Sequence, residues 1–191
     1  MPVLTEQSSP SALGPSVIWR NWVSNQVSRV GHFGMPSNDE EACALVKVAA
    51  RNGLTVRVAG TGHSYTPIVP TDGVLVSAER LTGIEAIDPT RGHVTLRGGT
   101  RICDVGPALR AAGWALPNQG DIDLQTISGA ISTGTHGSGD DIQCLAGPIV
   151  AMRFAASDGS MLRISEESDP DTLRAAQVSI GMFGIILSIT M

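Results

Sequence analysis

The sequence predicts a fold that mixes short β-strands with a few amphipathic helices. Its 191 residues suit one domain, or two small subdomains packed together, because domains commonly hold ~100–200 residues. Hydrophobic residues make up 42% of the chain, which is enough for a packed core and too many for disorder. Apolar residues recur at helical spacing in two segments, and short β-prone runs bounded by turn residues occupy much of the rest.

The first helix is expected over residues 38–52. Ser37 and Glu40 have the spacing of a capping box, and Gly53 follows where a helix can end in the left-handed conformation. One stripe of this helix is apolar at 3.6-residue spacing and is therefore expected to be buried: Ala42, Leu45, Val46 and Ala49.

Short strands are expected after this helix, each bounded by turn-forming residues. Asp72-Gly73 introduces the second strand, and Pro89 and Gly92 separate the last two. The strands are expected at residues 54–58, 74–78, 84–88 and 94–97. A second helix follows over residues 101–112, with Thr100 as its N-cap, and Pro107 inside it predicts a kink or a later start.

The last part of the chain is expected to hold a hairpin, a helix and a strand. Residues 149–156 and 161–164 pair across Asp158-Gly159, and a third helix spans 171–178. The strand over 185–191 alternates in polarity and ends on an exposed Met that invites pairing at a sheet edge. One of its faces is expected to hold Leu187, Ile189 and Met191.

Charge and cysteine content narrow the class of protein. The net charge is −5 without a Lys/Arg cluster, which argues against a nucleic-acid partner and a polybasic membrane patch. Cys43, Cys103 and Cys144 are odd in number and lack zinc spacing, which favours free thiols in a reducing compartment and no metal site. Residues 1–15 do not resemble a signal peptide, and no run approaches the ~18 apolar residues of a membrane span. We therefore expect a cytoplasmic protein without a transmembrane segment, and membrane association by other means stays open.

A glycine-containing loop, residues 59–64, directly follows a predicted strand. Gly60 and Gly62 permit positive φ values, and consecutive N–H groups in such a turn suit a phosphate or pyrophosphate. The loop lacks the third glycine and the helix of a Rossmann fingerprint, and it lacks the Gly-Lys-Ser/Thr of a P-loop. A tight structural turn remains the alternative. In a structural turn His63 is an ordinary loop histidine. In a binding loop it is a nucleophile or a hydrogen-bonding partner for a ligand.

A second loop, residues 120–137, consists largely of Gly, Ala, Ser and Thr. Such small side chains are not expected to fill a core, but they can hold a flat ligand or a diphosphate close to the backbone. Four large aliphatic residues argue against a solvated linker and favour an ordered ligand wall: Ile122, Leu124, Ile127 and Ile131. Asp121 and Asp123 are expected to cap turns rather than to bind a metal or act as bases.

Five motifs stand in order along residues 19–191. They are Trp19-x-x-Trp22 and the segments 56–65, 115–123, 129–137 and 179–186. Each is weakly diagnostic alone, and core or surface packing would explain the tryptophan pair. Together they resemble the PCMH-type FAD-binding domain of the vanillyl-alcohol oxidase superfamily, specifically its aldonolactone and alditol oxidase branch.

The resemblance implies an α+β fold of two subdomains, about 19–83 and 84–191, after a leader of residues 1–18, with FAD in the groove between them. It implies that the pyrophosphate lies against Ala59, Gly60, Thr61, Gly62, His63 and Ser64. It places the flavin and ribityl chain against Asp121, Thr126, Gly129, Thr133, Gly134, Thr135 and His136. Ile185 would contact the far end of FAD, and Gly120 matches a position beside the flavin where small residues leave oxygen a path. His63 matches the histidine that in this family bonds covalently to the flavin.

The same resemblance implies oxidation of a CH–OH group of a sugar lactone or polyol by hydride transfer to FAD. Oxygen or a one-electron carrier would then reoxidise the flavin. Family members continue into a substrate-binding cap domain, which this sequence lacks, so no catalytic residue is assigned within the chain. The chain is expected to be the cofactor-binding part of such an enzyme. The alternative is a non-catalytic FAD-binding module that needs a partner chain for activity.

Overall fold

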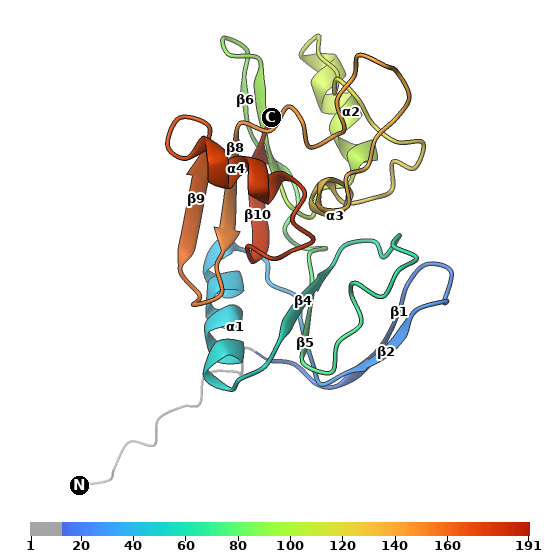
Figure 1. The fold of residues 1–191 in the computed structure, drawn as a ribbon, viewed down its shortest axis with the longest axis vertical. Helices are drawn as coiled ribbons and strands as arrows, with labels where there is room; N and C mark the ends of the chain where they lie inside the picture. The colour runs from blue at the N-terminus through green and yellow to red at the C-terminus, as the bar shows by residue number, and fades with distance from the viewer. Residues whose placement is uncertain (1–12) are drawn as a thin grey trace, which may run out of the picture.

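The fold, taken from a computed structural model that describes residues 13–191, contains three β-sheets and four helices within that range (Figure 1). The strands are β1 (Val17–Arg20), β2 (Val27–Val30), β3 (His32–Gly34), β4 (Val56–Ala59), β5 (Val74–Ser77), β6 (Ile84–Asp88), β7 (His93–Arg97), β8 (Ala151–Ala155), β9 (Met161–Ser165) and β10 (Ile185–Thr190). The helices are α1 (Asp39–Arg51), α2 (Ile102–Ala111), α3 (Ile127–Ser132) and α4 (Pro170–Gln177). The expected mixture of helices and strands is confirmed.

The first half of the fold combines a hairpin with a small parallel sheet. Strands β1 and β2 pair antiparallel, and the parallel sheet has the order β3-β5-β4. Strands β1, β2 and β3 were not anticipated from the sequence. The end of the expected leader is packed on this part of the fold: the N–H of Gly14 donates to the carbonyl of Phe33, and Val17 begins β1. Residues 1–12 of that leader lie outside the described part of the chain.

Helix α1 begins one residue later than the expected capping box implies. The N-cap is Asn38, whose side chain accepts a hydrogen bond from the N–H of Glu41. Glu41 in turn accepts from both the N–H and the hydroxyl of Ser37. The polar cap therefore forms with Glu41 in the place expected for Glu40. At the other end, Gly53 takes the predicted left-handed conformation with φ +64°.

The second half of the fold is a five-stranded antiparallel sheet of order β6-β7-β10-β8-β9. Strand β10 is therefore central, and the expectation of an edge strand with an exposed end is wrong. Met191 is 7% exposed, and its backbone exchanges two hydrogen bonds with that of Val94. The hairpin β8–β9 forms across Asp158-Gly159 as predicted, with Gly159 at φ +77°.

The expected division of β10 into two faces is also wrong. A β-bulge shifts the register of β10 against β8 between Ile186 and Ser188. Leu187 consequently packs with α1, whereas Ile189 and Met191 pack on the opposite face of the sheet. A bulge inserts one extra residue into a strand, so a strict two-residue alternation cannot carry through it.

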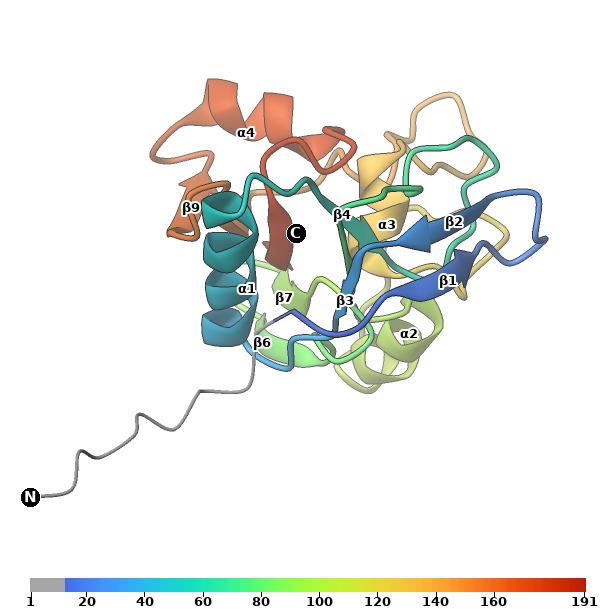
Figure 2. The same cartoon turned by 90° about the horizontal axis from the view of Figure 1, so that it is seen from below.

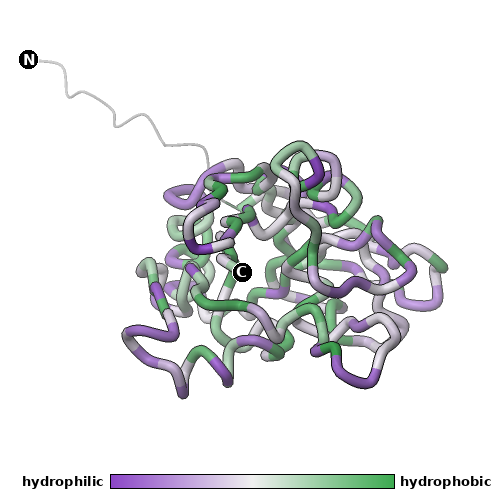
Figure 3. The backbone as a smooth tube through the Cα atoms, turned by 90° about the horizontal axis from the view of Figure 1, so that it is seen from above, coloured by the Kyte–Doolittle hydropathy of each residue, from purple (hydrophilic) through white to green (hydrophobic). Residues whose placement is uncertain are grey.

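Helix α1 packs against both sheets and joins them. Its apolar stripe contacts Val74 and Val76 of β5 on one side and Leu187 of β10 on the other. The helices α2, α3 and α4 cover the opposite face of the five-stranded sheet (Figures 1 and 2). Figure 3 shows the apolar segments gathered inside this arrangement and polar segments on the outer loops.

Helix α3 lies inside the loop that was expected to be only a ligand wall. Ile127, Ala130 and Ile131 are fully buried in the core against the five-stranded sheet. The expectation that this segment cannot contribute to a core is therefore wrong, although Ile122 and Leu124 are about half exposed. Small residues between the aliphatic ones allow α3 to pack closely. Helix α2 starts after Arg101, and the hydroxyl of Thr100, the expected N-cap, instead donates to the carbonyl of Gly83.

Candidate functional site

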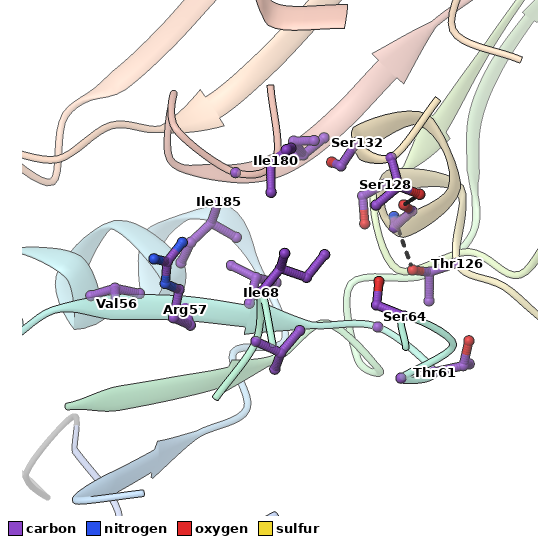
Figure 4. A pocket seen from close by; sticks show the side chains of 18 of the residues that line it. Val56, Arg57, Thr61, Ser64, Ile68, Thr126, Ser128, Ser132, Ile180 and Ile185 are labelled. Carbon is purple, nitrogen blue, oxygen red and sulfur yellow. Dashed lines mark hydrogen bonds between the residues drawn. The ribbon is translucent and has the colours of Figure 1, made fainter. Parts of the chain in front are cut away.

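A cleft lies between the parallel sheet and the five-stranded sheet (Figure 4). One wall is formed by β4 and the glycine loop after it. The opposite wall is formed by α3, the segment 180–184 and the beginning of β10. The cleft contains about 1120 Å³ of empty space, including the part that is open to solvent.

The glycine loop lines this cleft and carries a row of unused backbone donors. Within the described residues 13–191, the N–H groups of residues 60–65 donate no hydrogen bond to any protein acceptor. Residues 60–64 line the cleft, and Gly62 has φ +72°. Successive N–H groups left free in such a turn form a site for an anionic group. The loop therefore carries consecutive free N–H groups beside the cleft.

Gly60 allows the glycine loop to lie directly against the start of α3. A Cβ atom at this position would come within 2.1 Å of the Oγ1 atom of Thr126. That oxygen caps α3 by accepting a hydrogen bond from the N–H of Gly129 at 3.2 Å. Only glycine at position 60 permits this contact without displacing the cap, so the two walls meet here.

The two ends of the cleft differ in chemistry. Around Thr61, Ser64, Thr126, Ser128 and Ser132 the walls carry hydroxyl groups (Figure 4). At the other end the walls are largely apolar, with Val56, Ile68 and Ile185 (Figure 4). A ligand with a polar, phosphate-bearing part and a flat apolar ring would match both ends.

The electrostatics of the cleft favour an anionic ligand. None of the described residues that line it is acidic, and its titratable members are Arg57 and His63. The side chain of Arg57 projects from β4 near Ile185 and has no carboxylate within ion-pair distance among the described residues (Figure 4). A negatively charged ligand would therefore meet no repelling carboxylate on the walls.

The cleft brings together most of the site residues expected from the sequence. Those that line it are Gly60, Thr61, Gly62, His63, Ser64, Thr126, Gly129, Thr133 and Ile185. Ala59 instead packs its side chain in a small core cluster with Val30 and Leu75. The remaining expected residues, Gly120, Asp121, Gly134, Thr135 and His136, are not among the lining residues.

Those remaining residues belong to the segment 118–143, which the side chain of Asn118 links by hydrogen bonds. The side chain of Asn118 accepts from the N–H of Gly137 and donates to the carbonyl of Gln143. The imidazole of His136 is exposed and contacts the carbonyl of Gly137 at 2.8 Å. Their relation to a ligand stays a prediction.

Several lining residues were not singled out as site residues from the sequence. Arg57 lies within a quoted motif, and Ile180, Gly181 and Gly184 lie within another. Ile180 adopts φ +52°, which is unusual for a β-branched residue, and the sequence carries no signal for it. Ser157 follows β8 and reaches the cleft only because β8 lies beside β10. The motif order alone could have pointed to the segment 180–184.

Comparisons with known proteins agree with this geometry. The chain is 38% identical over 92% of its length to an L-gulono-1,4-lactone dehydrogenase of Mycobacterium tuberculosis, and this match covers 40% of that protein. It is 34% identical over 91% of its length to a D-arabinono-1,4-lactone oxidase of Candida glabrata, covering 34% of it. Mouse L-gulonolactone oxidase is 31% identical over 92% of the chain. The chain thus spans roughly two fifths or less of the length of these relatives.

Solved structures share the fold at lower sequence identity. Cholesterol oxidase from B. sterolicum superposes with a TM-score of 0.83 at 17% identity, over the whole of this chain and 39% of that one. Xylooligosaccharide oxidase from Myceliophthora thermophila gives a TM-score of 0.82 at 21% identity, over 90% of this chain and 37% of that one. These matches confirm the expected α+β fold of the vanillyl-alcohol oxidase type. The profile of the FAD binding domain family matches residues 32–165, more than half of the sequence, and the chain belongs to this family.

Proposed function

We propose that the chain holds FAD in the cleft and forms the cofactor-binding part of an oxidoreductase that acts on CH–OH groups. The observation that carries this proposal is the run of free N–H groups at residues 60–65 in a loop that lines the cleft. Two phosphate groups offer many acceptor oxygens for these donors. The absence of acidic lining residues supports the same assignment.

The chemistry of the two cleft ends orders the parts of FAD along it. The pyrophosphate would lie against Gly60, Thr61 and the loop residues that follow them. An aromatic ring would pack at the apolar end against Val56 and Ile185, while Thr126 and the hydroxyl-bearing residues beside it would face the ribityl chain and flavin. When bound, FAD supplies the ring that accepts a hydride from the substrate. The chain's own residues hold and orient it, which reduces the entropic cost of reaction.

His63 is proposed as the covalent anchor of FAD. It lines the cleft directly after the positive-φ residue Gly62, so its imidazole can face a ligand bound to the loop. The bond would join an imidazole nitrogen to the 8α-carbon of the flavin, with loss of one N–H and one C–H proton. The two electrons released would pass to dioxygen, which would leave as hydrogen peroxide. The anchor would prevent loss of the cofactor.

The names of the relatives suggest the substrate class. We propose a sugar lactone or related polyol as the electron donor, and oxygen or a one-electron carrier as the acceptor. The chain spans only part of those relatives, so residues that bind substrate are proposed to lie outside residues 1–191. The alternative, a non-catalytic FAD-binding module that works with a partner chain, is consistent with the same short span.

We also propose how the chain is divided and in which compartment it resides. We propose a subdomain boundary near residue 83, because β5 ends before it and the five-stranded sheet begins after it. Among the described residues, no helix is long and apolar enough to cross a membrane. The three free, half-buried cysteines support a reducing compartment such as the cytoplasm.

Loading the 191-residue chain with FAD tests these proposals. We expect FAD to bind with quenching of its fluorescence, and part of it to stay with the protein after acid precipitation. His63→Ala should still take up FAD but release all of it into the acid supernatant. Failure of the wild-type chain to take up FAD contradicts the cofactor assignment. Release of all flavin by the wild-type chain contradicts only the covalent anchor.

An assay for lactone oxidation by the FAD-loaded chain separates the oxidoreductase from the non-catalytic FAD-binding module. Turnover by this chain alone would exclude the non-catalytic module. Turnover that appears only when the remaining part of the enzyme is added in trans would support a cofactor part that needs a partner. The same assay with a polyol in place of the lactone tests the substrate class.

A further inference from the structure

The turn of the β1–β2 hairpin forms hydrogen bonds with the glycine loop. Figures 1 and 2 show this hairpin beside the segment that joins β4 to β5. The N–H of Trp22 donates to the carbonyl of Gly62 at 3.2 Å, and the side chain of Asn21 donates to the carbonyl of Ser64 at 3.0 Å. The side chain of Gln26 donates to the carbonyl of Tyr65 at 2.8 Å. The hairpin turn therefore uses the carbonyls of the loop and leaves its N–H groups free.

Asn21, which is buried, forms several of the hydrogen bonds that fix this turn against the loop. It is only 3% exposed, and its side chain also bonds Asn25 and accepts from the N–H of Gln26 at 3.1 Å. A buried amide with all these partners holds one geometry, because a shifted turn would leave polar groups unpaired. The position of the glycine loop is thus set by residues about 40 positions earlier in the chain.

Trp22 lies against the imidazole of His63. The ring centroids are 5.2 Å apart and the planes are inclined by 34°, and the indole also meets Tyr65 edge-on at 6.0 Å. The side chain of Trp22 is 54% exposed, so core packing does not account for it. An exposed indole inclined against a half-buried imidazole in the cleft wall points to a role for the ring contact itself.

We propose that Trp22 is a positioning residue that holds the imidazole of His63 in the orientation required for bonding to FAD, an inference that rests on the proposed function. His63 follows a glycine and makes no side-chain hydrogen bond among the described residues, so little else restrains its ring. The indole covers one side of the imidazole and restricts its rotation. Fixing one orientation raises the rate of bond formation at a neighbouring carbon, because less rotational freedom is lost in the transition state.

The rate of covalent flavin incorporation tests this role without measuring turnover. We compare Trp22→Ala and Trp22→Phe with wild type, and with Ile18→Ala as a matched control, since Ile18 lies on the same hairpin and is 48% exposed. Each purified apo chain is mixed with FAD, and acid-stable flavin is followed over time. We expect Trp22→Ala to slow incorporation about tenfold or more. Trp22→Phe, which keeps an aromatic ring, should restore most of the rate, and Ile18→Ala should match wild type.

Two further measurements separate positioning from a merely structural effect. The Kd for non-covalent FAD, measured in a His63→Ala background, and the Tm should be unchanged by Trp22→Ala. An unchanged rate in Trp22→Ala, or a loss that parallels a weaker Kd or a lower Tm, would overturn the proposal. If wild type binds FAD without forming the bond, the covalent anchor and this role both fall while the cofactor assignment stands.

The ring contact can also be measured without FAD. The ring current of the indole should change the chemical shifts of the imidazole C–H protons of His63 in the NMR spectrum of the apo chain. Trp22→Ala should remove that change, and Ile18→Ala should leave it. Identical His63 resonances in wild type and Trp22→Ala would show that the rings are not in contact and would overturn the proposal.

Discussion

At Gly60 the absence of a side chain decides how closely the glycine loop approaches α3. A Cβ atom there would collide with the Oγ1 atom of Thr126, which is 2% exposed and caps α3. We expect Gly60→Ala to cost about 1–2 kcal/mol of unfolding free energy through the lost cap, and to weaken FAD binding. Urea denaturation and FAD titration measure the two effects.

A second glycine provides the control for this substitution. Gly106 lies inside α2 with open space around its Cβ position, so Gly106→Ala should be neutral or stabilise by up to ~1 kcal/mol. Combining Gly60→Ala with Thr126→Ala should cost less than the sum of the two changes, because the collision is then absent. Strict additivity would contradict the proposed contact.

At the scale of one element, the start of α1 should respond to pH. The N–H and hydroxyl of Ser37 donate to the Glu41 carboxylate, and these bonds lower the pKa of Glu41 below its usual 4.5. The folded state thus favours the charged form, so its contribution to stability is present above the unfolded pKa and is lost as pH falls through the folded pKa. We expect Glu41→Gln to lower the Tm at pH 7 and to have little effect near pH 3.

Glu40 separates this bond from a general effect of charge at the start of a helix. It occupies the same first turn, and none of the described residues donates a side-chain hydrogen bond to it. Glu40→Gln should therefore change the Tm less than Glu41→Gln at pH 7. Equal changes for both variants would assign the effect to the helix dipole instead.

At the scale of the whole molecule, an ion-pair network joins α1 to the five-stranded sheet. Asp39 at the start of α1 contacts Arg97 of β7 at 2.6 Å and Arg153 of β8 at 2.8 Å, and both arginines also contact Glu85 of β6. The side chain of Asp39 is only 11% exposed. Asp39→Ala should destabilise the fold by roughly 2–3 kcal/mol, since it leaves two partly buried arginines undercompensated.

An exposed pair provides the matched comparison for this network. Arg91 and Glu167 lie 3.7 Å apart with side chains 65% and 78% exposed. Arg91→Ala should change the unfolding free energy by less than about 0.5 kcal/mol, because exposed pairs are screened by water. Chemical denaturation of both variants checks the difference, and similar values would show that the network does not join α1 to the five-stranded sheet energetically.

The sequence by itself determined the helices α1, α2 and α4, the strands from β4 onward and the order of the family motifs. Those features depend on signals within a few residues, such as Gly53 after α1 or the Asp158-Gly159 turn. The conformation of the glycine loop depends on a local signal as well, since Gly62 permits its positive φ of +72°.

Only the tertiary structure decided where these pieces meet. Packing between elements decided the central place of β10 and the bulge at Leu187. The contact of Gly60 with Thr126 and the hydrogen bond from Asn21 to Ser64 join residues that are far apart in the chain. Local propensity carries no information on such partners, because they are selected by burial and hydrogen bonding between elements in the folded state.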